Sequence, residues 1–272
     1  MHSRGQGIAP AYEGWEKNAD GSFNLVFGYM NRNWDEAITV PVGSDNNFQS
    51  GGQDQGQPTH LLPRRNFFVF RVRVPGDFGD RELVWTLTAN GKTERAYGTL
   101  KPGYFLNKDV IAATLGAVGP GVTNKEVSER NRAPTLKVEG SADRIARVGE
   151  PIVLVAIADD DDLPRRVAAP AWMGSPVASA IGTLLSPAGL RVAWFVYRGA
   201  GNAVTFDPPQ FKVYVDLRGG SPWSPGWTPP PIPPGNRWTT RVSFSAPGTY
   251  VLRCLAHDGA AATHQDIRVT VN

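Results

Sequence analysis

"VSFSAPGTYVLRCLAHDG", residues 242–259, is the stretch that decides the fold. The Pro247-Gly248 pair predicts a tight turn between two strands, because proline fixes φ and glycine adopts the positive φ values that many turns need. Three side chains then follow at every second position, which places them on one face of a strand: Tyr250, Leu252 and Cys254. Asp258-Gly259 predicts the next turn. The stretch therefore indicates consecutive antiparallel strands.

More strands are expected on both sides of this stretch, about a dozen residues apart and separated by turn residues, which is typical of a β-sandwich. The segments with strand patterns lie at 135–140, 143–160, 189–199, 211–219, 239–244, 249–256 and 264–271. The sequence thus predicts one β-sandwich domain over residues 134–272, with a Pro- and Trp-rich insertion inside it.

The first half of the chain has a similar pattern. Strands are predicted at 22–30, 36–43 and 67–75, and a hairpin at 82–100, where Asn90-Gly91 suits a type I′ turn. A polar loop of about twenty residues separates the second strand from the third, and loops of that length are functional or mobile in most domains. Residues 1–107 are predicted to form an N-terminal β-sandwich, and 108–133 a linker with a short helix. The expected fold class is all-β, with two antiparallel β-sandwich domains.

Charge and hydropathy argue against nucleic-acid binding and against a transmembrane helix. The 28 basic and 25 acidic residues leave a net charge of +3 and are dispersed, whereas nucleic-acid binding favours clustered Lys and Arg. No apolar run approaches the ~18 residues of a transmembrane helix. The first residues also lack the apolar segment of a signal peptide.

Four segments of the second half carry a resemblance: "VGEPIVLVAIADDDDLP" (148–164), "LRVAWFVYRGAG" (190–201), residues 242–259 and "DIRVTV" (266–271). Together they resemble the PKD and cadherin-like branch of the immunoglobulin-like superfamily. Two long insertions, and Asp162 where glycine is common, depart from that pattern. The first half resembles uncharacterised secreted bacterial proteins. The resemblance implies an immunoglobulin-like second domain and a secreted or periplasmic protein whose signal peptide is not present in this sequence.

The acidic run Asp159, Asp160, Asp161 and Asp162 is the candidate metal site. Calcium takes six to eight oxygen ligands, and acidic loops between strands supply them. The run lacks the spacing of an EF-hand, and Arg165-Arg166 could neutralise it. Two interpretations stay open, a charged turn and a weak calcium site to which Asp258 and Asp266 would add ligands. No second acidic motif supports a catalytic pair of carboxylates.

Two histidines give a second, weaker metal hypothesis. His257 and His264 flank one turn and, with Asp258 or Asp266, could bind a transition metal. Exposed histidines on a hairpin are the favoured interpretation. The single cysteine, Cys254, is expected to be a small buried side chain.

Tryptophans mark the candidate contact surface. "GSPWSPGWTPPPIPPGNRW" (220–238) is a Pro-rich segment that would present aromatic rings at low entropic cost. Exposed tryptophans stack on sugar rings or anchor protein partners. The predicted ligand or partner contacts are Trp223, Trp227 and Trp238.

The predicted function rests on the lack of recognisable catalytic motifs in the sequence. No nucleophile motif and no phosphate-binding loop is present. The sequence favours a non-catalytic extracytoplasmic protein with a structural, adhesion or assembly role, acting on a protein partner or on copies of itself. One alternative is a carbohydrate-binding module that uses the three tryptophans on a polysaccharide. Another is a hydrolase subunit, catalytic or accessory.

Overall fold

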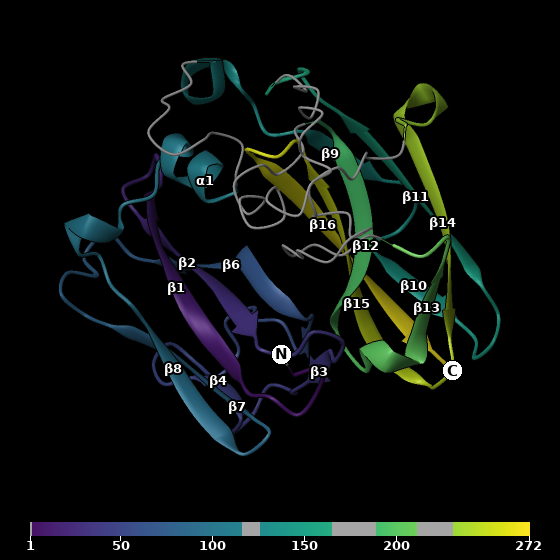
Figure 1. Ribbon diagram of the computed structural model, residues 1–272, viewed down its shortest axis with the longest axis horizontal. Coiled ribbons are helices and arrows are strands. Elements are labelled where there is room, and N and C mark those ends of the chain that lie inside the picture. Colours follow the sequence, from purple (N-terminus) through teal and green to yellow (C-terminus); the bar gives the residue numbers. More distant parts are fainter. Residues whose placement is uncertain (1, 116–125, 165–188, 211–230) are drawn as a thin grey trace. The chain divides into compact units, whose positions relative to one another are not determined.

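The structure is a computed structural model that describes residues 2–115, 126–164, 189–210 and 231–272 (Figure 1). It divides into two compact units. The first comprises Met1–Asn107 with Tyr197–Gly201, and the second Lys108–Val196 with Asn202–Asn272. Residues 108–133, predicted as a linker, are grouped with the second unit and contain helix α1 (Lys108–Thr114) and the helical turn η2 (Glu126–Arg130).

The first unit is built from antiparallel strands in two three-stranded sheets and one short pair. One sheet has the order β1 (Ile8–Lys17), β2 (Phe23–Asn31), β6 (Arg64–Val74). The other has the order β4 (Asn46–Phe48), β7 (Leu83–Ala89), β8 (Lys92–Gly98). The short pair joins β3 (Ile38–Thr39) to β5 (His60–Leu61).

Aromatic rings fill the core of this unit. On β6, Phe70, Val72 and Val74 are buried as the alternation predicted, and the Phe70 ring lies 5.0 Å from that of Trp85. Phe68 was expected on the same face, but it is only half-buried. It lies where the β2–β6 register shifts, with φ at 52°. This β-bulge interrupts the alternation.

The long polar loop is ordered by one buried side chain. Asn46 has no exposed surface, and its Oδ1 accepts a hydrogen bond from the Trp85 indole Nε1 at 2.9 Å. Its Nδ2 donates to the carbonyl oxygens of Val40 and Pro58, both at 2.9 Å. Buried polar groups need such partners, so these bonds hold the loop against the core. Strands β4 and β5, which the sequence analysis missed, lie within this loop.

The second unit has the strand order of an immunoglobulin-like sandwich. One sheet has the order β13 (Val204–Asp207), β14 (Arg237–Phe244), β11 (Ile152–Asp159), β9 (Thr135–Val138). The other has the order β10 (Asp143–Ala146), β16 (Ala262–Val271), β15 (Gly248–His257), β12 (Arg191–Arg198). When the immunoglobulin strand letters are assigned in chain order, the first sheet has the order D-E-B-A and the second contains G-F-C. Strand β10 pairs in parallel with β16, at the edge of the second sheet.

Two further features of that fold are present. Trp194 is buried on β12, the third strand of the fold, and the Tyr250 hydroxyl donates to the carbonyl of Ala246 at 2.9 Å. The second feature is a tyrosine corner. Cys254 is fully buried in the same core, as predicted. The predicted fold class, two β-sandwiches with an immunoglobulin-like second one, is confirmed. The strand predicted at 211–219 lies outside the described residues.

Candidate functional site

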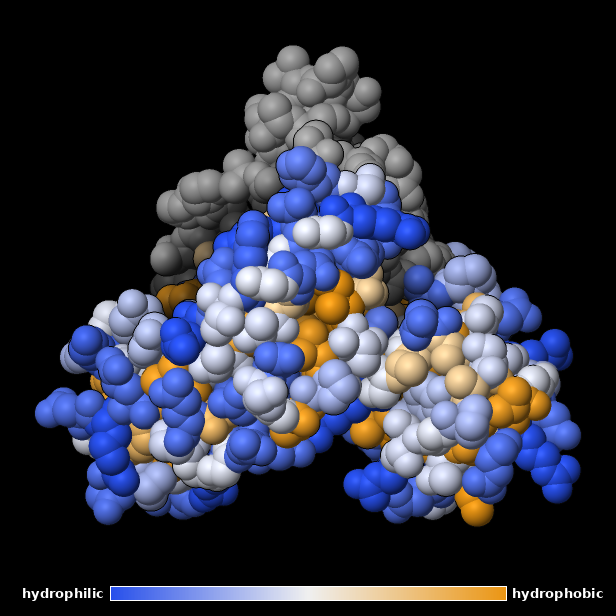
Figure 2. Space-filling view, turned by 90° about the horizontal axis from the view of Figure 1, so that it is seen from below, coloured by the Kyte–Doolittle hydropathy of each residue, from blue (hydrophilic) through white to orange (hydrophobic). Residues whose placement is uncertain are grey.

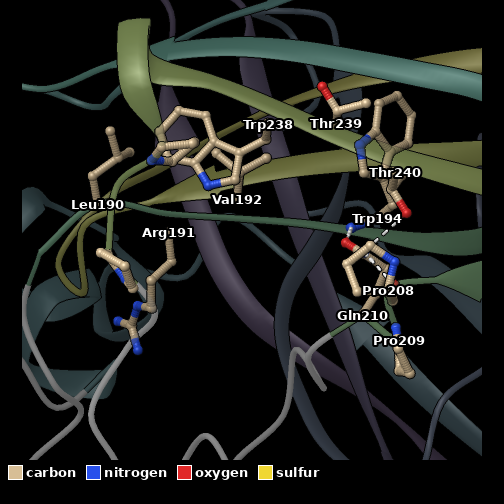
Figure 3. A pocket seen from close by; sticks show the side chains of 12 residues that line it. Leu190, Arg191, Val192, Trp194, Pro208, Pro209, Gln210, Trp238, Thr239 and Thr240 are labelled. Atoms are coloured by element: carbon tan, nitrogen blue, oxygen red, sulfur yellow. Dashed lines mark hydrogen bonds between the residues drawn. The ribbon is translucent and has the colours of Figure 1, made fainter.

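The second unit contains a pocket of about 330 Å³ (Figure 3). Its walls come from the start of β12, from the segment that follows β13, and from the start of β14. Trp194 and Trp238 line it together with four prolines, so much of the surface is apolar and rigid. A cavity of this size accommodates a small ligand such as one or two sugar rings.

Gln210 closes the pocket between the two sheets. Its Oε1 accepts a hydrogen bond from the backbone N–H of Trp194 at 3.0 Å, and its Nε2 donates to Thr240 Oγ1 at 3.3 Å (Figure 3). Nε2 also donates to the carbonyl of Pro208 at 2.9 Å. One side chain therefore joins edge strand β12 to β14 and fixes the spacing of the pocket walls.

The polar groups of this pocket include hydrogen-bond donors. The indole Nε1 of Trp194 is buried and has no hydrogen-bond partner within the described part of the chain. Arg191 lines the same pocket with a buried side chain (Figure 3). Its positive charge, after the larger effect of burial, lowers the pKa of His257 well below its ordinary value. A ligand with acceptor oxygens matches the indole N–H of Trp194.

Of the three tryptophans predicted as contact residues, the structure describes one. Trp238 was expected to be exposed, but it is half-buried and lines the pocket. Trp223 and Trp227 lie outside the described residues. The structure thus places one of the three residues at a site with a defined shape.

The first unit carries two sets of contacting aromatic rings, which share the segment Tyr104-Phe105 and which we together call the aromatic ledge. One set is Tyr12 with Tyr104, and the other is Trp15 with Phe23 and Phe105. Phe105 lies 4.9 Å from Trp15, and Tyr104 lies 5.3 Å from Tyr12, measured between ring centroids. Tyr104 and Phe105 remain 48% and 46% exposed. Sequence reasoning missed this group, although two consecutive aromatics after a Pro-Gly pair, in "KPGYFLN" (101–107), were a signal for it.

Hydrogen bonds hold the ledge against β1. The Trp15 indole donates to the carbonyl of Lys101 at 2.9 Å, and the backbone N–H of Leu106 donates to the carbonyl of Trp15 at 2.8 Å. The Tyr12 hydroxyl donates to the carbonyl of Thr99. The segment with the two exposed rings is therefore fixed at both ends.

The acidic run does not act as one cluster. Asp159 Oδ1 accepts a hydrogen bond from Asn236 at 3.0 Å, and Asp162 is exposed with φ at 60°. Asp161 accepts from the backbone N–H groups of Leu163 and Arg132, both at 3.1 Å. Asp160 is different, because both of its carboxylate oxygens are shielded from solvent and have no hydrogen-bond partner in the part of the chain described.

Asp160 lies near a second buried carboxylate, Asp258. The Asp258 side chain has no exposed surface and accepts hydrogen bonds from the N–H groups of Ala260 at 2.6 Å and Ala261 at 2.7 Å. Asn131 donates to its other oxygen at 3.1 Å. Burial raises the pKa of Asp160 to about 7, and the negative charges of Asp258 and Asp161 add to this effect. Burial also raises the pKa of Asp258.

The histidine hypothesis finds little support in the hairpin. His257 pairs with Ala262 and His264 with Leu255, so the two histidines are diagonal neighbours and not directly opposite each other. Asp266 is held in a bidentate ion pair by Arg253, at 2.7 and 2.8 Å. Across the described ranges, no three His, Cys, Asp or Glu side chains gather into a group that could hold a metal ion.

Comparisons with known proteins identify no family: no protein-family model and no curated protein matches the chain. Among solved structures, the chain is similar to the fibronectin(III)-like modules of CbhA from Clostridium thermocellum, with 13% identity and a TM-score of 0.25 over 97% of this chain and 94% of that one. It is similar to domains 4 and 5 of the S-layer protein SbsC, with 10% identity and a TM-score of 0.25 over 100% and 95%. It is also similar to the D00-D0 domain of intimin, with 10% identity and a TM-score of 0.26 over 97% and 99%. Such likeness carries no functional argument, and the immunoglobulin-like assignment rests on strand order and the tyrosine corner.

On the face shown in Figure 2, apolar residues form separate small groups among polar ones. Within the described ranges, no helix is long and apolar enough to cross a membrane.

Proposed function

We propose that the protein is a non-catalytic extracytoplasmic structural module that assembles through contacts between copies of the chain. The observation that carries the proposal is the aromatic ledge, where two rings stay about half exposed on a rigid mount. The exposed halves of these rings contribute little to the stability of the folded chain. Aromatic residues are enriched in protein interfaces, so a binding role accounts for their exposure. The resemblance of residues 134–272 to domains of secreted bacterial proteins supports the extracytoplasmic location.

Two physical features favour association through the ledge. Tyr104 and Phe105 are already ordered by the bonds to β1, so a partner loses little entropy in packing on them. The net charge of +3 is small for 272 residues, and repulsion between copies is therefore weak.

The pocket gives no support to the hydrolase alternative. The described residues that line it include no carboxylate, histidine or cysteine. A hydrolytic site needs such groups to activate water or a nucleophile.

Sedimentation velocity tests the proposal over a wide concentration range. The wild-type chain should sediment faster as its concentration rises, because dimers form. The double variant Tyr104→Ser/Phe105→Ser should remain monomeric. Ile145→Ser is the matched control, since Ile145 is 75% exposed on a strand of the second unit. A wild-type chain that stays monomeric, or a control that behaves like the double variant, would argue against assembly through the ledge.

A second candidate function is carbohydrate binding, and the pocket favours it. The half-buried Trp238 offers a face for stacking, and the Trp194 indole N–H offers a donor to a sugar hydroxyl. Polysaccharides present many acceptor oxygens, and the described residues that line the pocket include no acidic group to repel them.

Pull-down on a panel of insoluble polysaccharides tests this second function. We expect binding by the wild-type chain, and at least a tenfold weaker affinity for Trp238→Ala, since stacking contributes about 1–3 kcal/mol in comparable ring-on-ring contacts. The ledge double variant is the control and should bind like wild type. Retention of binding by Trp238→Ala would remove the pocket as the carbohydrate site.

A further inference from the structure

We propose that Asp160, Asp258 and Asn131 form a binding site for a hard divalent cation, with Ca²⁺ the best fit. The site goes beyond the proposed function. It uses only one of the four residues in the acidic run, and it lies in the second unit, whereas the ledge lies in the first.

The first observation is a set of buried acceptors without donors. Both oxygens of Asp160 and the Oδ1 of Asn131 are shielded from solvent and lack hydrogen-bond partners among the described residues. Asn131 as a whole is only 4% exposed. An unpaired buried polar group is costly, and three acceptor oxygens without donors call for a positive charge.

The second observation is that three chain segments bring these oxygens together. Asn131 Nδ2 contacts Asp258 at 3.1 Å, so the segment before β9 touches the turn between β15 and β16. The backbone N–H of Arg132 donates to Asp161 at 3.1 Å, which brings the same segment to the end of β11. The β9–β11 pairing of Thr135 with Asp159 fixes this juxtaposition.

The third observation is the sign of the local charges. The charges that act on the Asp160 carboxylate belong mainly to Asp258 and Asp161, with the smallest effect from Asp162, and all of them are negative. A proton on Asp160 would relieve part of the repulsion. Its single O–H could donate to only one acceptor, so other oxygens of the set would stay unpaired. A bound cation satisfies all of these oxygens at once.

The donor set decides which cation fits. Every available ligand atom is a carboxylate or amide oxygen, which hard cations prefer and which soft transition metals do not. Asp160 can bind through both oxygens, and Asp258 and Asn131 can add one each. Water would complete the six to eight ligands of Ca²⁺, so the affinity should lie in the 10⁻⁴–10⁻³ M range of extracellular calcium modules, about that of weak sites.

Calorimetric titration of the full chain with CaCl₂, after treatment with EDTA, tests the site. The variant Asp160→Asn removes the carboxylate, and the variant should fold because no other side chain among the described residues is hydrogen-bonded to Asp160. Asp162→Asn is the matched control, with the same change of charge two residues away at an exposed position. Its φ of 60° suits asparagine as well as aspartate.

The wild-type chain and Asp162→Asn should bind Ca²⁺ with dissociation constants within about twofold of each other, and Asp160→Asn at least tenfold more weakly. Thermal melts should show a rise in melting temperature with Ca²⁺ for the first two proteins only, and equal ionic strength of NaCl should not reproduce it. Absence of binding by wild type up to about 10 mM Ca²⁺ would overturn the proposal, as would unchanged binding by Asp160→Asn.

Discussion

The hydroxyl of Tyr250 donates a hydrogen bond to the carbonyl oxygen of Ala246, at 2.9 Å, across the corner between β14 and β15. Tyr250 is 1% exposed, and its ring lies 4.9 Å from that of Phe244. The bond therefore ties the turn between two strands of opposite sheets to the core. It also explains why "PGTY" predicts this corner: the Pro-Gly pair makes the turn and the tyrosine secures it.

Tyr250→Phe should destabilise the second unit by about 1 kcal/mol, because the ring stays and only one buried hydrogen bond is lost. Urea unfolding followed by tryptophan fluorescence measures the change. Tyr97→Phe, at a residue that is 50% exposed, is the control and should leave the free energy of unfolding unchanged. Equal effects of the two substitutions would mean that the corner bond contributes nothing.

Asn46→Ala should destabilise the first unit by about 2–4 kcal/mol, because it leaves the Trp85 indole N–H and two carbonyl oxygens buried without partners. Asn47→Ala removes bonds to Gly43 and Ser44 at a less buried position and should cost less than 1 kcal/mol, roughly one ordinary hydrogen bond. Chemical denaturation distinguishes the two. A cost for Asn46→Ala no larger than that for Asn47→Ala would contradict the proposed role of Asn46 in ordering the loop.

Gly14→Ala should displace the segment that carries Tyr104 and Phe105 from its position against β1. Gly14 has φ at 140°, and a Cβ there would overlap the carbonyl oxygen of Tyr104. We expect the free energy of unfolding to fall by about 2 kcal/mol or more, because backbone strain and the steric conflict add together. Gly103→Ala is the control, since a Cβ at that position meets no atom within 4 Å. A stable Gly14→Ala variant with an unchanged near-ultraviolet circular dichroism spectrum would contradict this account of the ledge.

The stability of the protein should depend on pH in a way that reflects the raised pKa of Asp160. Its pKa is about 7 in the folded protein, against about 4 for an aspartate in an unfolded chain. Between these values the folded state binds more protons, so stability falls as the pH rises.

Asp160→Asn lacks this proton, so the comparison of the two proteins isolates it. In EDTA, wild type should lose about 1–2 kcal/mol relative to the variant between pH 5 and pH 8, after allowance for solvent screening of a half-buried residue. Urea titrations at both values measure the loss. Parallel pH profiles for wild type and Asp160→Asn would show that Asp160 titrates normally.

Local patterns predicted most strands of the immunoglobulin-like core, but not β13 (Val204–Asp207). The hairpin at Asn90-Gly91 forms as expected, with φ of 49° at Asn90, and β15 follows the Pro-Gly turn. Strand β1 was missed because Pro10 and Gly14 interrupt its apolar pattern, and its position depends on pairing with β2. Tertiary pairing outweighs local propensity at such positions.

The candidate sites were less predictable, for a related reason. Four consecutive aspartates look alike in sequence, and only the fold shows that Asp160 turns inward beside Asp258. Asn131 carries no local signal at all, because its role depends on contact with a turn far along the chain. Trp238 was chosen for its Pro-rich surroundings, but the pocket that it lines is completed by Gln210 and Trp194.

Photo-crosslinking from the ledge tests the central claim, assembly through contacts between copies, most directly. With benzoylphenylalanine in place of Phe105, irradiation should yield a covalent dimer, and mass spectrometry should locate the linked position on the ledge of the second copy. The same amino acid in place of Ile145 should leave the chain monomeric. Monomer alone from position 105, or equal dimer yields from both positions, would contradict assembly through the ledge.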